Sequence, residues 1–279
     1  MASARIITDS SCELAADVIE PLGITVLPWR VRVGAEILVD TPGLRTPEWY
    51  QSLLDKKLTP SVVPPSAQDY VQAFERLTRE TDQIIVVTPG TKLARCLTLA
   101  NQARQAFLGR STIHVLDSTF IGRAMGMLVE ETARLARQGE TTTDIIREVS
   151  GLIPRSYLAI YTDSLATMAQ RGLVDDRDEE VRGTASYRPL LLVEDGQIVP
   201  LPRSRKRGAP AERIVEFVAE FSKLSQLYLI HNGHAPLMNE LRTALGEALP
   251  KQTYTEHIFG PVFAALIGLR AFAVAALEA

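Results

Sequence analysis

Two short apolar segments of this chain each end in an aspartate, a serine and a second hydroxyl residue. Ile6-Ile7-Thr8 runs into Asp9-Ser10-Ser11, and Ile113-His114-Val115-Leu116 runs into Asp117-Ser118-Thr119. Both apolar segments are short and rich in β-branched residues, which predicts buried strands. A helical pattern follows each Asp-Ser pair, where short oxygen side chains accept hydrogen bonds from free backbone N–H groups. Such N–H groups also make strand-to-helix turns suitable for holding an anion.

Strands and helices alternate through the N-terminal half of the chain. Further apolar strands are expected at 24–28 and 84–88, with helices between the strands. Strands separated by helices predict parallel pairing, and the carboxyl ends of parallel strands meet at one edge of a sheet. Thr8, Thr88 and Asp117 should therefore converge on one cleft. The proline-rich segment 59–66 cannot be helical, and 34–44 is expected to be a loop.

A second set of strands and helices follows a change of composition near Pro154. A strand is expected at 157–161, a hairpin about Asp195-Gly196, and another strand at 227–230. We therefore expect two α/β domains, residues 1–154 and residues 155–279, the first with a mainly parallel sheet. The cleft between two domains is a common site for a buried ligand.

Composition narrows the class of protein. The chain has 279 residues, of which 46% are hydrophobic and 23% charged, as is typical of a soluble globular protein. A net charge of −3 provides no field that attracts nucleic acid. The longest apolar stretch, Gly260 to Ala276, is interrupted by Arg270 and is too short to span a bilayer. Because the chain starts directly in a strand, without a leader, we expect a cytoplasmic protein that is not embedded in a membrane.

The sequence contains no recognisable set of acid, base, nucleophile or metal ligands. Cys12 and Cys96 are expected to be small buried residues. His231 and His234 are expected in a turn, because a metal site needs further ligands. An enzyme that uses Ser10 or Ser118 as nucleophile stays open as an alternative, although it lacks a paired histidine base. Turns that can hold a ligand, without evident chemistry, favour a binding protein over an enzyme.

Several motifs, in their order and spacing, are similar to those of one known family. They are Thr8-Asp9-Ser10-Ser11, the strand ending in Asp117-Ser118, Asp163-Ser164-Leu165, and Pro189-Leu190-Leu191 followed by Asp195-Gly196-Gln197-Ile198. Along nearly its whole length the chain resembles the DegV family of bacterial fatty-acid-binding proteins.

The resemblance implies two α/β domains with a fatty acid buried between them. Hydroxyls and basic side chains would hold the carboxylate, and an apolar tunnel would hold the acyl chain. The expected ligand is a long-chain fatty acid such as palmitate, oleate or stearate, with no other cofactor. The resemblance further implies a non-catalytic carrier that presents its ligand to a separate fatty-acid kinase subunit, which phosphorylates the carboxylate.

Departures from the family pattern fall on the head-group site that the resemblance implies. The family loop Thr-Thr-Ser-Gln-Pro is Ser61-Val62-Val63-Pro64-Pro65 here, so Ser61 keeps a hydroxyl and Val62 replaces one. In the next turn, Gly90 to Leu97, Ala94 replaces a serine. The family's Gly-Gly-Arg is Arg171-Gly172-Leu173, and a C-terminal histidine of the family falls at Leu266. Only Arg205 matches a basic head-group position.

These departures weaken the expected carboxylate site. Burying an unpartnered carboxylate costs several kcal/mol at least, and each charge-assisted hydrogen bond contributes roughly 1.5–3 kcal/mol. Arg95 or Arg171 is a candidate replacement cation. Otherwise the ligand is less polar, such as a neutral lipid, a fatty alcohol or an ester. A further alternative is a regulatory or interaction module on the same fold, whose altered pocket binds such a lipid or nothing.

Simpler interpretations accompany these candidates. Asp9-Ser10 and Asp117-Ser118 can serve only to staple their turns, and Thr91 is expected to cap the helix after it. Arg95 can be an ordinary surface residue, and Arg205 part of a solvated basic run, although the family match favours a role for Arg205. The candidate ligand-binding residues are Ser61, Val62, Thr91, Ala94, Arg95, Ser118 and Arg205.

Overall fold

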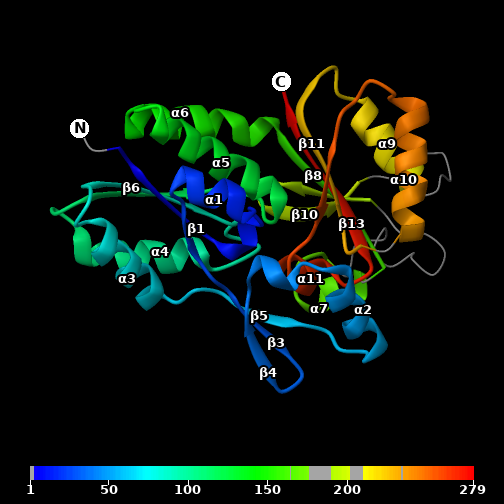
Figure 1. The fold of residues 1–279 in the computed structure, drawn as a ribbon, viewed down its shortest axis with the longest axis horizontal. Coiled ribbons are helices and arrows are strands. Elements are labelled where there is room, and N and C mark those ends of the chain that lie inside the picture. Colours follow the sequence, from blue (N-terminus) through cyan, green and yellow to red (C-terminus); the bar gives the residue numbers. More distant parts are fainter. Residues whose placement is uncertain (1–2, 164, 176–189, 202–209, 234) are drawn as a thin grey trace.

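Three β-sheets and the helices around them make up the protein, whose computed structural model describes residues 3–163, 165–175, 190–201, 210–233 and 235–279. In Figure 1 a four-stranded sheet and its helices lie on the left, and a six-stranded sheet and its helices lie on the right. A small three-stranded sheet projects below them. The α/β fold expected from the sequence is confirmed.

The four-stranded sheet is parallel throughout. Its strands, in spatial order, are β2 (Thr25–Leu27), β1 (Arg5–Asp9), β6 (Gln83–Thr88) and β7 (Thr112–Asp117). These positions and the parallel pairing confirm the sequence-based prediction for the N-terminal half. Because successive side chains of a strand point to opposite faces, Ile84 and Val86 pack on one side of the sheet and Ile85 and Val87 on the other.

Helices cover both faces of this parallel sheet. They are α1 (Ala16–Leu22), α3 (Ala67–Leu77), α4 (Cys96–Arg104), α5 (Arg123–Arg137) and α6 (Thr142–Leu152). Helices α3 and α4 share a core with Ile84 and Val86, and α5 shares a core with Ile85 and Val87. The start of α3 has a local cause, since Ser66 and Asp69 form a reciprocal capping box.

The six-stranded sheet is mixed. In spatial order its strands are β10 (Gln197–Pro200), β9 (Leu191–Glu194), β8 (Ser156–Thr162), β13 (Ala271–Glu278), β11 (Leu224–His231) and β12 (Thr255–Ile258). Only β11 and β12 pair in parallel. The hairpin expected about Asp195-Gly196 is confirmed. Strands β12 and β13 were not anticipated; for β13 the reason is that 260–276 had the pattern of one buried segment.

Helices of the second half lie on both sides of the mixed sheet. They are α7 (Leu165–Gln170), α9 (Pro210–Ala219), α10 (Ala235–Ala248) and α11 (Pro261–Ile267). In β13, Phe272 and Val274 share a core with α9 and α10. Ala271 and Ala273, on the opposite face, join the core that reaches the parallel sheet.

The three-stranded sheet corrects one expectation. It has the order β4 (Glu36–Val39), β3 (Arg30–Val33), β5 (Ser61–Val63), and both pairings are antiparallel. The prediction that 34–44 is a loop was wrong for 36–39. The reason is a two-residue hairpin at Gly34, whose φ of 60° allows the chain to turn back onto β3 at once. Helix α2 (Pro47–Asp55) follows, capped by Thr46.

Side chains fill much of the seam between the two larger sheets. One continuous hydrophobic core contains Phe120 and Met125 from the first half and Leu158 and Phe263 from the second. Arg123 of α5 also donates a hydrogen bond to the Tyr228 hydroxyl of β11 at 2.6 Å. The chain passes from one sheet to the other through a 3₁₀ turn, η4 (Ile153–Arg155), and we propose this turn as the boundary between domains 1–154 and 155–279. Among the described residues, no helix is long and apolar enough to cross a membrane.

Candidate functional site

The first Asp-Ser turn uses its polar atoms internally. Asp9 is buried, and its carboxylate accepts hydrogen bonds from the Ser11 backbone N–H at 3.0 Å and from the Trp29 indole N–H at 2.8 Å. The Ser10 hydroxyl accepts a bond from the Trp29 backbone N–H at 3.0 Å. Burial raises the pKa of Asp9, and these hydrogen bonds only partly oppose the rise. The turn therefore holds the start of the three-stranded sheet against the end of β1.

The turns after β6 and β7 meet as the parallel sheet predicted. Asp117 accepts hydrogen bonds from the Thr91 hydroxyl and from the Thr91 and Thr119 backbone N–H groups. The Ser118 hydroxyl bonds to the backbone of Phe120, at 3.2 Å from both its nitrogen and its oxygen. The expectation that Thr91 caps α4 was wrong, because that helix begins only at Cys96. The Thr91 side chain thus joins the two turns to each other, while the Ser118 side chain closes its own turn.

Gly90 allows this close approach. A Cβ atom at Gly90 would lie 2.8 Å from the Thr119 carbonyl oxygen, where no side chain fits. The Gly90 N–H donates to the Phe120 carbonyl oxygen at 2.8 Å.

The head-group positions implied by the resemblance are apolar and partly buried. Val62, Ala94, Leu173 and Leu266 all pack at the margin of the common core. Ser61, beside Val62 on β5, is exposed. Arg95 is exposed immediately before α4, and Arg171 is exposed after α7. Arg205 lies outside the described residues.

A cavity of about 640 Å³ lies between the two halves of the molecule. Lys92 and Leu93 line it from the turn after β6. The second half contributes Ala169, the segment 172–175 and the hairpin residues 196–200. Its wall is mixed: aliphatic side chains such as Leu93 and Ile198 stand beside polar ones, with Lys92 as a cation and Asp175 as an anion among the described residues. None of the described candidates Ser61, Val62, Thr91, Ala94, Arg95 and Ser118 is among its lining residues.

A second polar feature connects the halves near the end of β1. Glu13 is 1% exposed and lies in the left-handed region at φ 57°. Its carboxylate accepts a hydrogen bond from the Gly260 N–H at 2.5 Å and contacts His257 Nε2 at 3.0 Å. Arg45 donates to the Leu14 and Ser10 carbonyl oxygens nearby. Because Glu13 and His257 are 244 positions apart, no local pattern could have paired them.

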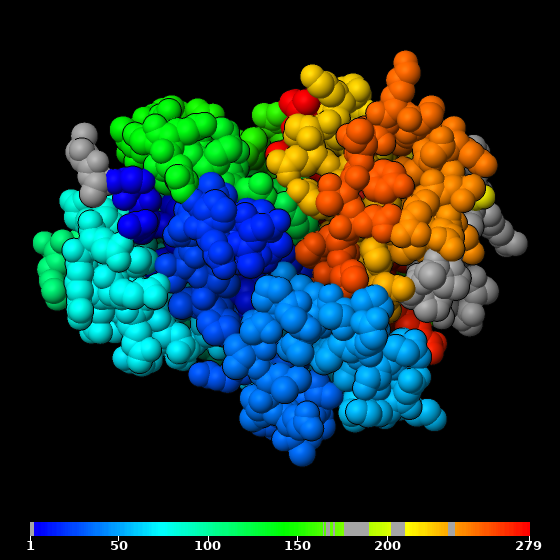
Figure 2. All heavy atoms as spheres, in the orientation of Figure 1, coloured from blue at the N-terminus to red at the C-terminus, as the bar shows by residue number. Residues whose placement is uncertain are grey.

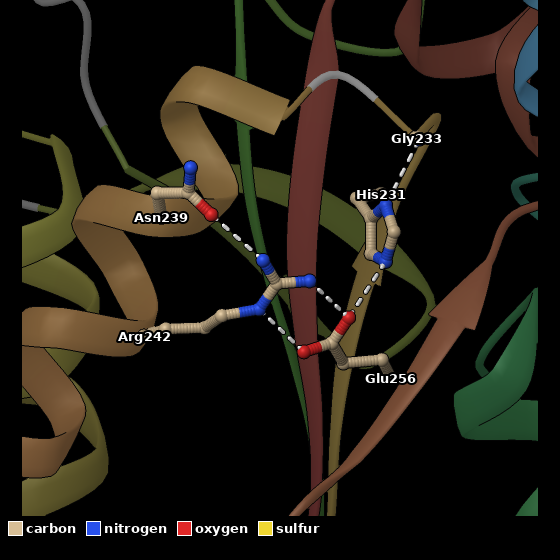
Figure 3. A network of polar contacts seen from close by, with 5 residues as sticks. All are labelled: His231, Gly233, Asn239, Arg242 and Glu256. Atoms are coloured by element: carbon tan, nitrogen blue, oxygen red, sulfur yellow. Dashed lines mark hydrogen bonds and ion pairs between the residues drawn. The ribbon is translucent and has the colours of Figure 1, made fainter.

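A third polar network lies at the end of β11 (Figure 3). His231 Nδ1 accepts a hydrogen bond from the Gly233 N–H at 2.9 Å, and Nε2 faces Glu256 at 3.6 Å. Arg242 holds Glu256 with two bonds of 2.6 Å and also bonds Asn239 at 2.8 Å. Burial lowers the pKa of His231, which keeps the ring neutral near pH 7. Among the described residues, no cluster of three histidine, cysteine or acidic side chains is arranged to bind a metal ion.

A family model described as "Uncharacterised protein, DegV family" matches residues 3–279 of the chain. The chain belongs to the DegV family. The resemblance inferred from the Asp-Ser motifs is thereby confirmed.

Similar proteins and solved structures agree with this assignment. A DegV domain-containing protein of Caldanaerobacter subterraneus is 26% identical over 253 residues, which are 89% of each chain. The structure of a fatty-acid-binding DegV family protein from Streptococcus agalactiae has a TM-score of 0.88 at 19% identity and covers 100% of both chains. A stearic-acid-binding protein from Eubacterium ventriosum has a TM-score of 0.83 at 17% identity, over 99% of this chain and 98% of that one. These structural likenesses show a shared DegV fold.

The candidates from the turn after β6 differ from the residues of that turn that line the cavity, and their role in ligand binding stays a prediction. Sequence reasoning singled out Ala94 and Arg95, whereas Lys92 and Leu93 of the same turn line the cavity. The available signal was the position of Lys92 in the segment aligned with the family's head-group turn. Which side chains of that turn face the second domain depends on the path of the backbone, and spacing alone does not give that path.

Proposed function

We propose that this DegV protein is a non-catalytic carrier that binds a long-chain fatty acid or a related lipid between its two domains. The observation that carries the proposal is the cavity between the turn after β6 and the β9–β10 hairpin, whose mixed wall offers aliphatic side chains to an acyl chain and polar ones to a head group. DegV proteins of the same fold are described as binding fatty acids, including stearic acid. Burying the methylene chain of palmitate contributes on the order of 10 kcal/mol. The acyl chain can therefore supply most of the affinity.

We propose Lys92 as the cation that meets the carboxylate. Val62, Ala94, Leu173 and Leu266 offer no polar side chain, whereas Lys92 is one of the residues that line the cavity. The same four apolar positions also support a second candidate function, in which the pocket takes a less polar lipid. Binding of a fatty alcohol distinguishes a pocket for a carboxylate from a pocket for a less polar lipid, because the alcohol has the same acyl-length chain without the charge.

The test begins with the protein as purified from a bacterial host. Solvent extraction and mass spectrometry should detect a co-purified fatty acid, and delipidated protein should bind added palmitate, oleate or stearate. Protein that is free of lipid and ignores all three would refute the carrier proposal.

Head-group preference is measured by comparing palmitate with hexadecanol. We expect Lys92→Met to weaken palmitate binding about 10-fold, by loss of one charge-assisted contact, and to leave hexadecanol binding unchanged. Lys251→Met, at an exposed position of the second domain, is the matched control. Equal binding of the acid and the alcohol by the wild type would favour the less polar ligand.

We further propose that the protein acts in the cytoplasm and presents its fatty acid to a separate kinase subunit, as the family resemblance implies. A purified kinase subunit of this kind, with ATP, should convert the bound fatty acid to an acyl phosphate only when the carrier is present. The alternative, an interaction module without a lipid cargo, predicts a bound partner protein and no dependence of that binding on lipid.

A further inference from the structure

One face of the three-stranded sheet exposes large aliphatic side chains. Ile37 and Val39 of β4 are 59% and 52% exposed, and Val63 of β5 is 56% exposed. Among the described residues only two other large hydrophobic side chains, Leu108 at 66% and Tyr254 at 36%, are exposed. Three of five therefore lie on one small sheet, whereas single exposed apolar residues are ordinary.

The strand register places two arginines among these side chains. Arg30 lies between Val39 and Val63, and Arg32 lies between Ile37 and Ser61. Side chains two positions apart in a strand share a face, so all six point to the same side. We call this set the arginine–aliphatic face: Arg30, Arg32, Ile37, Val39, Ser61 and Val63.

The opposite face already supplies the packing that the sheet needs. Val31 is fully buried, and Val62 packs against the common core. The arginine–aliphatic face is therefore not required to bury its own side chains for folding. In Figure 1 the sheet projects below the two halves, and Figure 2 shows this part of the chain as a lobe standing out from the surface.

The two cations of this face have no close partner among the described residues. None of its six residues is acidic, and within the described parts of the chain neither Arg30 nor Arg32 makes an ion pair or side-chain hydrogen bond. Hydrogen bonds from the Ser66 hydroxyl and N–H, both at 2.7 Å, lower the pKa of Asp69, and the charge of Arg30 adds to this from a distance. Two guanidinium groups without an ion pair among the described residues thus stand among three exposed aliphatic side chains.

We propose that the arginine–aliphatic face docks on the surface of an anionic phospholipid bilayer. Guanidinium groups bind phosphate in a bidentate manner, and adjacent aliphatic side chains can enter between head groups. Charge complementarity is local, because the whole chain carries a net charge of −3 and would otherwise be repelled by an anionic surface. The contact is peripheral and does not depend on whether the interdomain cavity carries a lipid.

Vesicle flotation tests the proposal directly. Full-length protein is mixed with vesicles of phosphatidylcholine alone, or with vesicles in which a third of the lipid is phosphatidylglycerol. We expect flotation with the anionic vesicles only, and weaker flotation at high salt because screening shortens the range of the attraction. The double variant Arg30→Gln/Arg32→Gln should bind about 25-fold more weakly, since each cation near an anionic surface contributes about 5-fold.

A second variant tests the contribution of the aliphatic side chains to vesicle binding separately from that of the arginine charges. Ile37→Thr/Val39→Thr keeps the β-branched shape of the strand while making its outer face polar, and should also reduce flotation. The matched control is Leu108→Ser/Arg110→Gln, which removes an exposed leucine and an exposed arginine from another loop and should float like wild type. Circular dichroism and urea denaturation confirm that each variant is folded.

Three results would overturn the proposal. One is wild-type protein that fails to float with anionic vesicles, and another is wild-type behaviour in both face variants. The third is a concentration-dependent dimer that is lost in Ile37→Thr/Val39→Thr, because it would assign the face to a second copy of this chain.

Discussion

Asp40 offers the sharpest test of the buried electrostatics. It follows β4 and is 3% exposed. Burial raises its pKa from 3.8 to about 6. The Ser10 hydroxyl and the Arg45 guanidinium oppose this rise only in part, because neither carboxylate oxygen meets a donor at good geometry within the described chain. Glu13 and Asp9 add a repulsive contribution of the same sign as burial.

The sign of the effect follows from the two pKa values. The unfolded chain loses the Asp40 proton near pH 3.8 and the folded protein only near pH 6, so ionisation destabilises the fold. The loss in free energy of unfolding is about 1 kcal/mol near pH 4.5 and about 3 kcal/mol near pH 8. Asp40→Asn removes this loss. Any fixed cost of the amide is independent of pH, so the difference between the two pH values isolates the charge.

Urea denaturation at the two pH values measures the prediction. The stability of Asp40→Asn relative to wild type should rise by about 2 kcal/mol from pH 4.5 to pH 8. Asp144→Asn is a flat control over this pH range, because a hydrogen bond from the Thr141 hydroxyl lowers the pKa of Asp144 and its carboxylate is ionised at both pH values. A relative stability of Asp40→Asn that is flat with pH, or that falls toward pH 8, would refute the reasoning.

Two further predictions concern packing and thiol chemistry. Gly90→Ala should destabilise the protein by about 1–3 kcal/mol in urea, because its Cβ would strike the Thr119 carbonyl oxygen. Gly151→Ala in α6, with no atom within 4 Å of the new Cβ, should instead stabilise by about 0.5–1 kcal/mol; the same sign for both variants would contradict the argument. Cys12 and Cys96 should not react with an aromatic disulfide reagent until the protein unfolds, since burial raises the pKa of Cys12 to about 12 and that of Cys96 further. Rapid labelling of either native thiol would show that its site opens.

Local pattern predicted the parallel half of the fold well, for a physical reason. Strands buried on both faces are continuous apolar runs, as at Ile84 to Val87, and each is followed by turn residues that bond their own backbone. The strands of the mixed sheet were harder to predict from local sequence pattern. Its strand β13 is rich in alanine on the face toward the first domain, and alanine carries no strand signal.

The candidate site was predicted only as far as its turns. Thr91 and Ser118 lie where the strand ends converge, but their hydroxyls bond Asp117 and Phe120. Lys92 faces the cavity because the backbone between Gly90 and Arg95 directs it toward the β9–β10 hairpin. A role for the described candidates Ser61, Val62, Ala94 and Arg95 in ligand binding stays a prediction.

The amino-acid sequence by itself determined the alternation of strands and helices, the Asp-Ser turns at the strand ends and, through them, membership of the DegV family. These features depend on neighbours within a few positions, which a linear pattern records. Tertiary structure alone decided that Glu13 meets His257, that Lys92 lines the interdomain cavity, and that Arg30 and Arg32 share a face with Ile37, Val39 and Val63. Each of these contacts joins distant parts of the chain, so it exists only once the sheets have taken their register and packed together.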